Sequence, residues 1–156
     1  FPLQEWVSRH LPGRNDERLF GCQAIVNDRD EVEGFCDRLL IGATELPLQE
    51  IAEKIHGLGG LAVASHIDRE SFSILSQLGF VDPATPLDAL EITAELGIAG
   101  GRRRYPELKD FPFVTSSDAH RIQEIGRTWT TVKVETVTIR EPAMAFRGQD
   151  GRAVEE

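Results

Sequence analysis

The stretch FPFVTSSDAH, residues 111–120, decides the fold prediction because an apolar run gives way to a row of polar residues within it. Its apolar start belongs to FPFVTSS, residues 111–117, which predicts a strand. Two serines, an aspartate and a histidine then follow. In parallel α/β folds the functional residues lie just beyond the carboxyl ends of the strands, so this polar row is a candidate site.

Two earlier apolar runs end in a comparable way. LAVASH, residues 61–66, ends at a histidine, and LDALEIT, residues 87–93, carries a glutamate near its end. Helical patterns separate the runs: residues 46–60 place apolar side chains on one face, and residues 68–80 predict a helix entered through Asp68 and closed by a glycine. This alternation predicts an α/β fold whose parallel sheet is either open or closed as a barrel.

The remaining segments have weaker patterns. We expect a short first helix, a β-hairpin with an Asn/Asp turn, a polar glycine-rich connection with a helical turn at most, a late strand rich in Thr and Val, and a loosely held tail. In chain order these lie at residues 1–10, 22–36, 95–110, 128–136 and 144–156.

Composition limits the classes of function. The chain has 156 residues, 40% of them hydrophobic, which fits a single domain over residues 1–156. The net charge of -9 gives no electrostatic case for holding a long nucleic acid over an extended surface. No apolar run is long enough for a membrane span. Cys22 and Cys36 read as buried core residues, and so few cysteines are expected of a cytoplasmic protein.

His66, Asp118 and His120 are the candidate metal ligands. If the strands are parallel, the three side chains reach one rim, and imidazole with carboxylate suits Zn, Mn or Fe. The alternative is that Asp118 caps a following helix, with Ser116 or Ser117 sharing that role, while His120 is merely exposed. The residue pattern by itself leaves both interpretations open.

A family resemblance favours the metal interpretation. The segments GGLAVASHIDRES, LDALEIT and FPFVTSSDAHRIQEIGRTWTTV resemble the later motifs of the PHP (polymerase and histidinol phosphatase) family, over about residues 43–132. Members of that family are metal-dependent phosphoesterases on a distorted, TIM-like β/α barrel. The resemblance implies that His66, Asp118 and His120 are metal ligands, and that Asp118 and His120 belong to the catalytic centre.

The chain also departs from the family pattern. Family members open with a His-x-His motif, followed by further ligands, and none of these is present here. His10 and His56 do not replace them, because each is expected near a helix end, where the helix dipole stabilises a histidine. The chain therefore resembles the later part of a PHP domain.

Three further residues are candidates for substrate binding. Arg69 and Arg127 could each hold a phosphate by bidentate contacts, although Arg69 could equally be solvated at a helix start. Glu91 either lines the site or pairs with an arginine at the strand end. Ser116 and Ser117 lack a histidine base at a spacing that suits nucleophilic catalysis. The three consecutive arginines from Arg102 are expected in an exposed loop.

The expected function is metal-dependent phosphoester hydrolysis through metal-activated water, acting on a small phosphorylated substrate or a nucleotide. The chain would supply part of the metal site. The alternative is a non-catalytic binding or oligomerisation segment, in which the missing N-terminal half of the domain or a second copy covers the exposed edges of an incomplete barrel.

Overall fold

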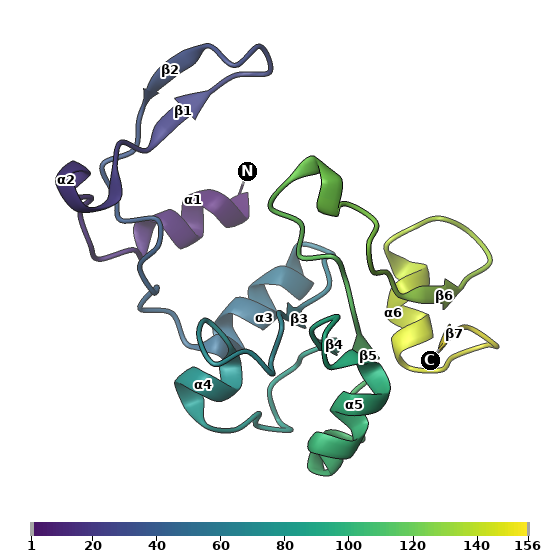
Figure 1. Cartoon of the computed structure of the whole chain (residues 1–156). Helices are drawn as coiled ribbons and strands as arrows, with labels where there is room; N and C mark the ends of the chain where they lie inside the picture. The colour runs from purple at the N-terminus through teal and green to yellow at the C-terminus, as the bar shows by residue number, and fades with distance from the viewer. Residues whose placement is uncertain (1, 156) are drawn as a thin grey trace. The chain divides into compact units, whose positions relative to one another are not determined.

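The computed structural model describes residues 2–155, and the chain forms two compact units, residues 1–51 and 52–156 (Figure 1). The predicted single domain over the whole chain stays a prediction. In the described part of the chain, no helix combines the length and apolar character needed to cross a membrane.

The first unit contains two short helices and the expected hairpin. Helix α1 spans Pro2–Arg9 and α2 spans Glu17–Phe20, while β1 (Ala24–Val26) pairs antiparallel with β2 (Val32–Phe35). The turn forms because the Asn27 side chain accepts hydrogen bonds from the backbone N–H groups of Arg29 and Glu31. The hairpin prediction is therefore confirmed.

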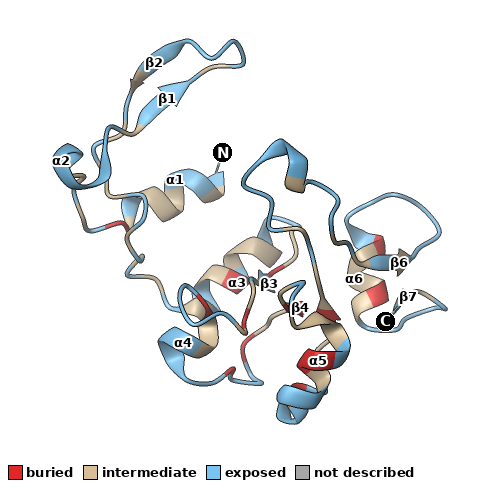
Figure 2. Ribbon diagram, viewed as in Figure 1, coloured by how far each residue is buried: buried red, intermediate tan, exposed pale blue. Residues whose placement is uncertain are grey.

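The cysteine prediction is wrong for this unit. Cys22 is exposed and Cys36 only partly buried, and both are free thiols. They flank the two strands of the hairpin, whose residues are exposed along nearly the whole length of both strands (Figure 2). A two-stranded ribbon without a covering layer has no interior in which to bury them.

The second unit contains a three-stranded parallel sheet. Its strands β3 (Val63–Ala64), β4 (Ala89–Glu91) and β5 (Phe113–Val114) lie in that order, with Val63 opposite Ala89 and Leu90 opposite Phe113. Each strand lies inside one of the three apolar runs predicted from the sequence. The closed barrel stays a prediction.

Helices connect and cover these strands. The helix α3 (Leu48–Gly57) precedes β3, α4 (Ile74–Leu78) lies between β3 and β4, and α5 (Gly97–Arg104) with the 3-10 helix η1 (Pro106–Leu108) lies between β4 and β5. A Cβ added at Gly101 would lie 2.9 Å from Ile92 and 3.2 Å from Phe113, so the glycine lets α5 approach the sheet closely.

The core lies between this sheet and its helices. Ile67, Leu90, Ile92 and Phe113 are its largest fully buried side chains, and buried positions also lie on α3 and α5 (Figure 2). Burying several such side chains is the main favourable contribution to folding of this unit.

Two predictions about the connections are wrong. Helix α4 begins after its N-cap Ser73, not at Asp68, because the Asp68 carboxylate accepts hydrogen bonds from the backbone N–H and hydroxyl of Thr93 at 2.8 and 2.5 Å. The three arginines lie in the last turn of α5 and not in a loop. The guanidinium of Arg102 stacks over the Phe113 ring at 4.2 Å, so its stem is part of the packing.

The tail is better ordered than its sequence predicts. After the 3-10 helix η2 (Ile122–Glu124), strand β6 (Thr131–Lys133) pairs antiparallel with β7 (Ala153–Glu155), and α6 (Arg140–Phe146) packs against both strands. Arg152 joins these elements through ion pairs to Glu135 at 2.6 Å and to the buried Glu141 at 3.0 Å. These contacts are long-range, so local periodicity could not show them.

The amino edge of the parallel sheet is held by a buried carboxylate. Asp88, 4% exposed at its side chain, accepts hydrogen bonds from the Ala62 backbone N–H at 2.9 Å, from Arg147 Nη2 at 3.2 Å and from the His56 imidazole at 2.6 Å. It thus ties the end of α3 and the end of α6 to the sheet. This confirms that His56 lies near a helix end, with a carboxylate as its partner.

We expect Asp88→Ala to lower the free energy of unfolding by roughly 2–3 kcal/mol, because it leaves the buried Ala62 N–H without an acceptor and removes the partner of His56 and Arg147. Chemical denaturation measures this loss. Asp110→Ala is the matched control, since Asp110 is exposed near the same edge, and it should change the stability by at most about 0.5 kcal/mol. Equal stability of the two variants would show that Asp88 does not hold this edge.

Glu141 should make the stability of the second unit depend on pH. Hydrogen bonding by Arg152 holds the pKa of the Glu141 carboxyl below its ordinary value, with the Glu135 backbone N–H adding to the effect. A carboxyl with a lowered folded-state pKa contributes stability above its unfolded pKa, and this is lost as the pH falls through the folded pKa.

Denaturation followed from about pH 6 down to about pH 3 should therefore show a smaller acid loss for Glu141→Gln than for the unchanged protein. Glu155→Gln, which replaces an exposed glutamate on β7, should keep the original pH dependence. An identical acid loss in the Glu141 variant and the unchanged protein would contradict this assignment.

Candidate functional site

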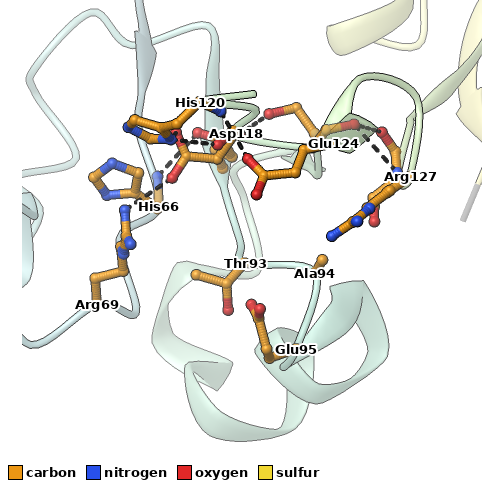
Figure 3. A pocket seen from close by; sticks show the side chains of 13 residues that line it. His66, Arg69, Thr93, Ala94, Glu95, Asp118, His120, Glu124 and Arg127 are labelled. Carbon is orange, nitrogen blue, oxygen red and sulfur yellow. Dashed lines mark hydrogen bonds and ion pairs between the residues drawn. The ribbon is translucent and has the colours of Figure 1, made fainter. Parts of the chain in front are cut away.

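A cavity of about 350 Å³ opens at the carboxyl edge of the parallel sheet, within the second unit (Figure 3). Residues from the ends of all three strands and from the segment after β5 line it. All six side chains singled out from the sequence are among them: His66, Arg69, Glu91, Asp118, His120 and Arg127. The structure therefore brings these residues together, while their roles stay predictions.

Backbone pairing continues past the strand ends, next to the residues that line the cavity. The N–H of Ile67 donates to the Glu91 carbonyl at 2.8 Å, and the N–H of Ile92 donates to the Val114 carbonyl at 2.8 Å. Because the strands are parallel, these bonds place the residues that follow each strand at one edge. His66 and the polar row after Val114 therefore face the same space.

Glu91 links two of these strand ends. One carboxylate oxygen accepts the His66 backbone N–H at 3.1 Å, and the other accepts a short hydrogen bond from the Ser116 hydroxyl. Of the two interpretations for Glu91, the structure fits the one in which it lines the site, because these partners include no arginine. Glu91 positions the backbone on either side of it.

His66 is held in an uncommon conformation. Its φ of 27° lies in the left-handed region, which costs free energy for a residue other than glycine. Its Nδ1 is buried without a hydrogen-bond partner among the described residues. A buried imidazole nitrogen normally has a partner, so this nitrogen is an unusual feature of a side chain that lines a cavity.

Asp118 also has a positive φ, 44°, and its carboxylate lies near two basic side chains. One oxygen forms an ion pair with Arg69 Nη1 at 2.8 Å, and the other lies 4.0 Å from Nδ1 of His120. The helix-cap alternative is wrong for this residue, because η2 begins only after Arg121 and has no side-chain cap. Asp118 instead projects toward Arg69 (Figure 3).

The segment from Ser116 to His120 is anchored to the chain that returns after η2. Ser117 Oγ donates to the Thr128 carbonyl at 3.0 Å, and His120 N–H donates to the Glu124 carboxylate at 2.9 Å. His120 Nδ1 lies 2.8 Å from the Asp118 carbonyl, where the imidazole can donate. Ser117 thus has a structural partner here, as Ser116 has in Glu91. That neither serine is a nucleophile stays a prediction.

Arg127 and five further residues complete the wall. The Arg127 side chain donates from Nε to the Gln123 carbonyl at 3.1 Å, which fixes part of the guanidinium beside the cavity. Sequence reasoning missed the lining residues Thr93, Ala94, Glu95, Glu124 and Thr128. The first three follow β4 by a few positions, so the strand-end rule could have found them, whereas the last two depend on how the chain returns after β5.

The donor types at this edge suit a divalent ion, but they are not assembled around one point. Two imidazoles and a carboxylate are ligands that Zn, Mn and Fe accept, and the unpartnered nitrogen of His66 leaves that ring uncommitted. Within residues 2–155, however, no three His, Cys, Asp or Glu side chains are arranged to hold a metal ion. Asp118 is engaged by Arg69 instead.

Comparisons with known proteins support an association with the PHP family. Residues 103–146 match a family model described as PHP-associated. The uncharacterized protein YqxK of Bacillus subtilis (strain 168) is 30% identical over 111 residues, which cover 67% of this chain. The chain spans 28% of the length of that relative. No solved structure matches the chain significantly.

We expect Glu91→Ala to lower the free energy of unfolding by about 1–2 kcal/mol, because the His66 N–H and the Ser116 hydroxyl both lose their acceptor. Denaturation measures the change, and NMR shifts of the His66 amide report the local effect. Glu95→Ala removes a carboxylate from the same cavity and should stay within about 0.5 kcal/mol of the unchanged protein. No difference between the two variants would rule out the positioning role of Glu91.

Proposed function

We propose that this chain supplies part of the active site of a metal-dependent phosphoesterase, with His66, Asp118 and His120 as its metal ligands. The observation that carries the proposal is the convergence of these three side chains, together with Arg69 and Arg127, on one cavity at the carboxyl edge of a parallel sheet. The PHP-associated match over residues 103–146 supports the same reading.

A divalent ion bound there would lower the pKa of a water molecule and orient the phosphoryl group. The chain's own residues would contribute binding and charge. Arg69 and Arg127 flank the cavity with guanidinium groups suited to phosphate oxygens. Glu91 keeps the strand ends in register beneath them.

Backbone geometry offers further support. Of the three proposed ligands, His66 and Asp118 both have positive φ values, 27° and 44°. Non-glycine residues in this region cost about 1–3 kcal/mol each, and such strain gathers at functional sites. Asp30, Phe72 and Asp150 share the feature outside the cavity lining, so the strain supports the proposal only together with the chemistry of the donors.

The proposed ligand set is incomplete for a cluster of several metal ions. Three protein ligands and a water molecule suffice for one catalytic zinc ion. The remaining ligands of a larger cluster would come from outside this chain. We therefore expect the isolated chain to bind one ion and to hydrolyse phosphate esters slowly or not at all.

A second candidate function is protein binding or self-association, favoured by the first unit. The β1–β2 hairpin exposes Ile25, Val26, Val32 and Phe35, each at least half exposed, and an uncovered apolar ribbon is a typical contact surface. Light scattering over a range of protein concentrations shows whether the chain associates with itself. A monomer at every concentration counts against self-association.

Calorimetric titration of Mn²⁺ or Zn²⁺ tests the leading proposal. The unchanged chain should bind one ion, and Asp118→Ala should weaken that binding about tenfold or more, since it removes the proposed anionic ligand. Asp110→Ala removes a carboxylate from the opposite edge of the sheet and should bind as the unchanged chain does. Absence of binding in all three proteins, or equal binding in all three, would sink the metal assignment.

A further inference from the structure

We propose that Arg69 and the metal ion are alternative partners of the Asp118 carboxylate, so that metal loading releases Arg69 to bind the substrate's phosphate. This inference deepens the proposed function and depends on it. It would make Arg69 a positioning residue for Asp118 in the unloaded site and a substrate-binding residue in the loaded one.

The contacts of Asp118 carry the first step. Its carboxylate pairs with Arg69 Nη1 at 2.8 Å, and this is the shortest ionic contact that either side chain makes in the described part of the chain. A carboxylate oxygen in a charge-assisted hydrogen bond has less electron density to offer a cation, and the guanidinium repels a divalent ion nearby. Coordination through the oxygen that Arg69 holds therefore competes with this pair.

The freedom of Arg69 carries the second step. The Arg69 and Asp118 side chains are 47% and 42% exposed, so neither is locked in place by packing. The backbone of Arg69 is fixed separately: its N–H donates to the His66 carbonyl at 3.1 Å and its carbonyl accepts the Ser73 hydroxyl at 2.7 Å. The guanidinium can therefore change partner while its Cα stays beside His66.

The charges of the cavity favour phosphate binding by Arg69 after the metal ion has bound. Carboxylates of Glu91, Glu95, Asp118 and Glu124 line the cavity, whereas its fixed cations are the guanidinium groups of Arg69 and Arg127. Without a metal ion, a phosphate would meet these carboxylates and an arginine that is already paired. With the metal ion bound, the charge on Asp118 is offset and Arg69 loses this partner, which frees its guanidinium for phosphate.

Arg69→Gln tests the exchange because it removes the guanidinium and keeps a polar side chain of moderate length. A half-exposed ion pair is worth little in water, so we expect the affinity for Mn²⁺ to rise by about two- to fivefold in calorimetry. Arg127→Gln is the matched control. It removes the same charge from the same cavity, and the Arg127 side chain donates to the Gln123 carbonyl and not to Asp118, so the affinity of this variant for Mn²⁺ should rise less.

Inorganic phosphate provides the second measurement. In the Mn²⁺-loaded chain, Arg69→Gln should weaken phosphate binding several-fold, whereas in the metal-free chain the variant and the unchanged protein should bind phosphate equally weakly. Thermal unfolding of both variants checks that they remain folded.

The outcomes separate the two proposals. Mn²⁺ binding that is lost in Asp118→Ala but equal in Arg69→Gln, Arg127→Gln and the unchanged chain would overturn the exchange and leave the metal site standing. An equal rise in Mn²⁺ affinity in Arg69→Gln and Arg127→Gln would show that the loss of any positive charge near the cavity has this effect. That result would also overturn the exchange. No Mn²⁺ binding by any variant would overturn both proposals.

Discussion

Parallel pairing of β3, β4 and β5 is the constraint on which the rest of the second unit depends. The strands are very short, so few ladder hydrogen bonds hold them, and burial of Leu90, Ile92 and Phe113 supplies most of the driving force. Pairing that continues through Ile67 and Ile92 brings three distant stretches of chain to one edge. The cavity exists because these stretches end together.

The two edges of this sheet have different chemistry. At the amino edge, Asp88 is buried and fully partnered by donors from three elements, an arrangement that stabilises the unit. At the carboxyl edge, charged side chains line an open cavity, two residues have positive φ, and the nitrogen of His66 lacks a partner. Buried polar groups are normally satisfied, and exceptions with strained backbone are a mark of functional sites.

Net charge is a poor guide to this cavity. The chain carries a net charge of -9, yet the cavity contains Arg69 and Arg127 among its carboxylates. In such an arrangement, each arginine can pair either with a carboxylate of the cavity or with a bound anion. Asp118 shows this most directly, because its carboxylate, proposed above as a metal ligand, pairs with Arg69 in this structure. The composition excludes a broad basic surface, and it says nothing about a local balance of this kind.

The sequence by itself determined the strand runs, the hairpin, α1, α3 and six of the residues that line the cavity, because period and strand-end position are local features of the chain. The sequence misplaced the start of α4, because the Asp68 side chain binds Thr93 instead of capping that helix. It wrongly placed the cysteines in the core, because the hairpin lacks a covering layer. It also missed the secondary structure of the tail, because Arg152 forms its ion pairs with Glu135 and Glu141, which come before that segment in the chain. Only the tertiary structure decided that Asp118 pairs with Arg69 and that Glu91 holds two strand ends. Those contacts join residues far apart in the chain, and no local pattern encodes which distant partner a charged side chain will find.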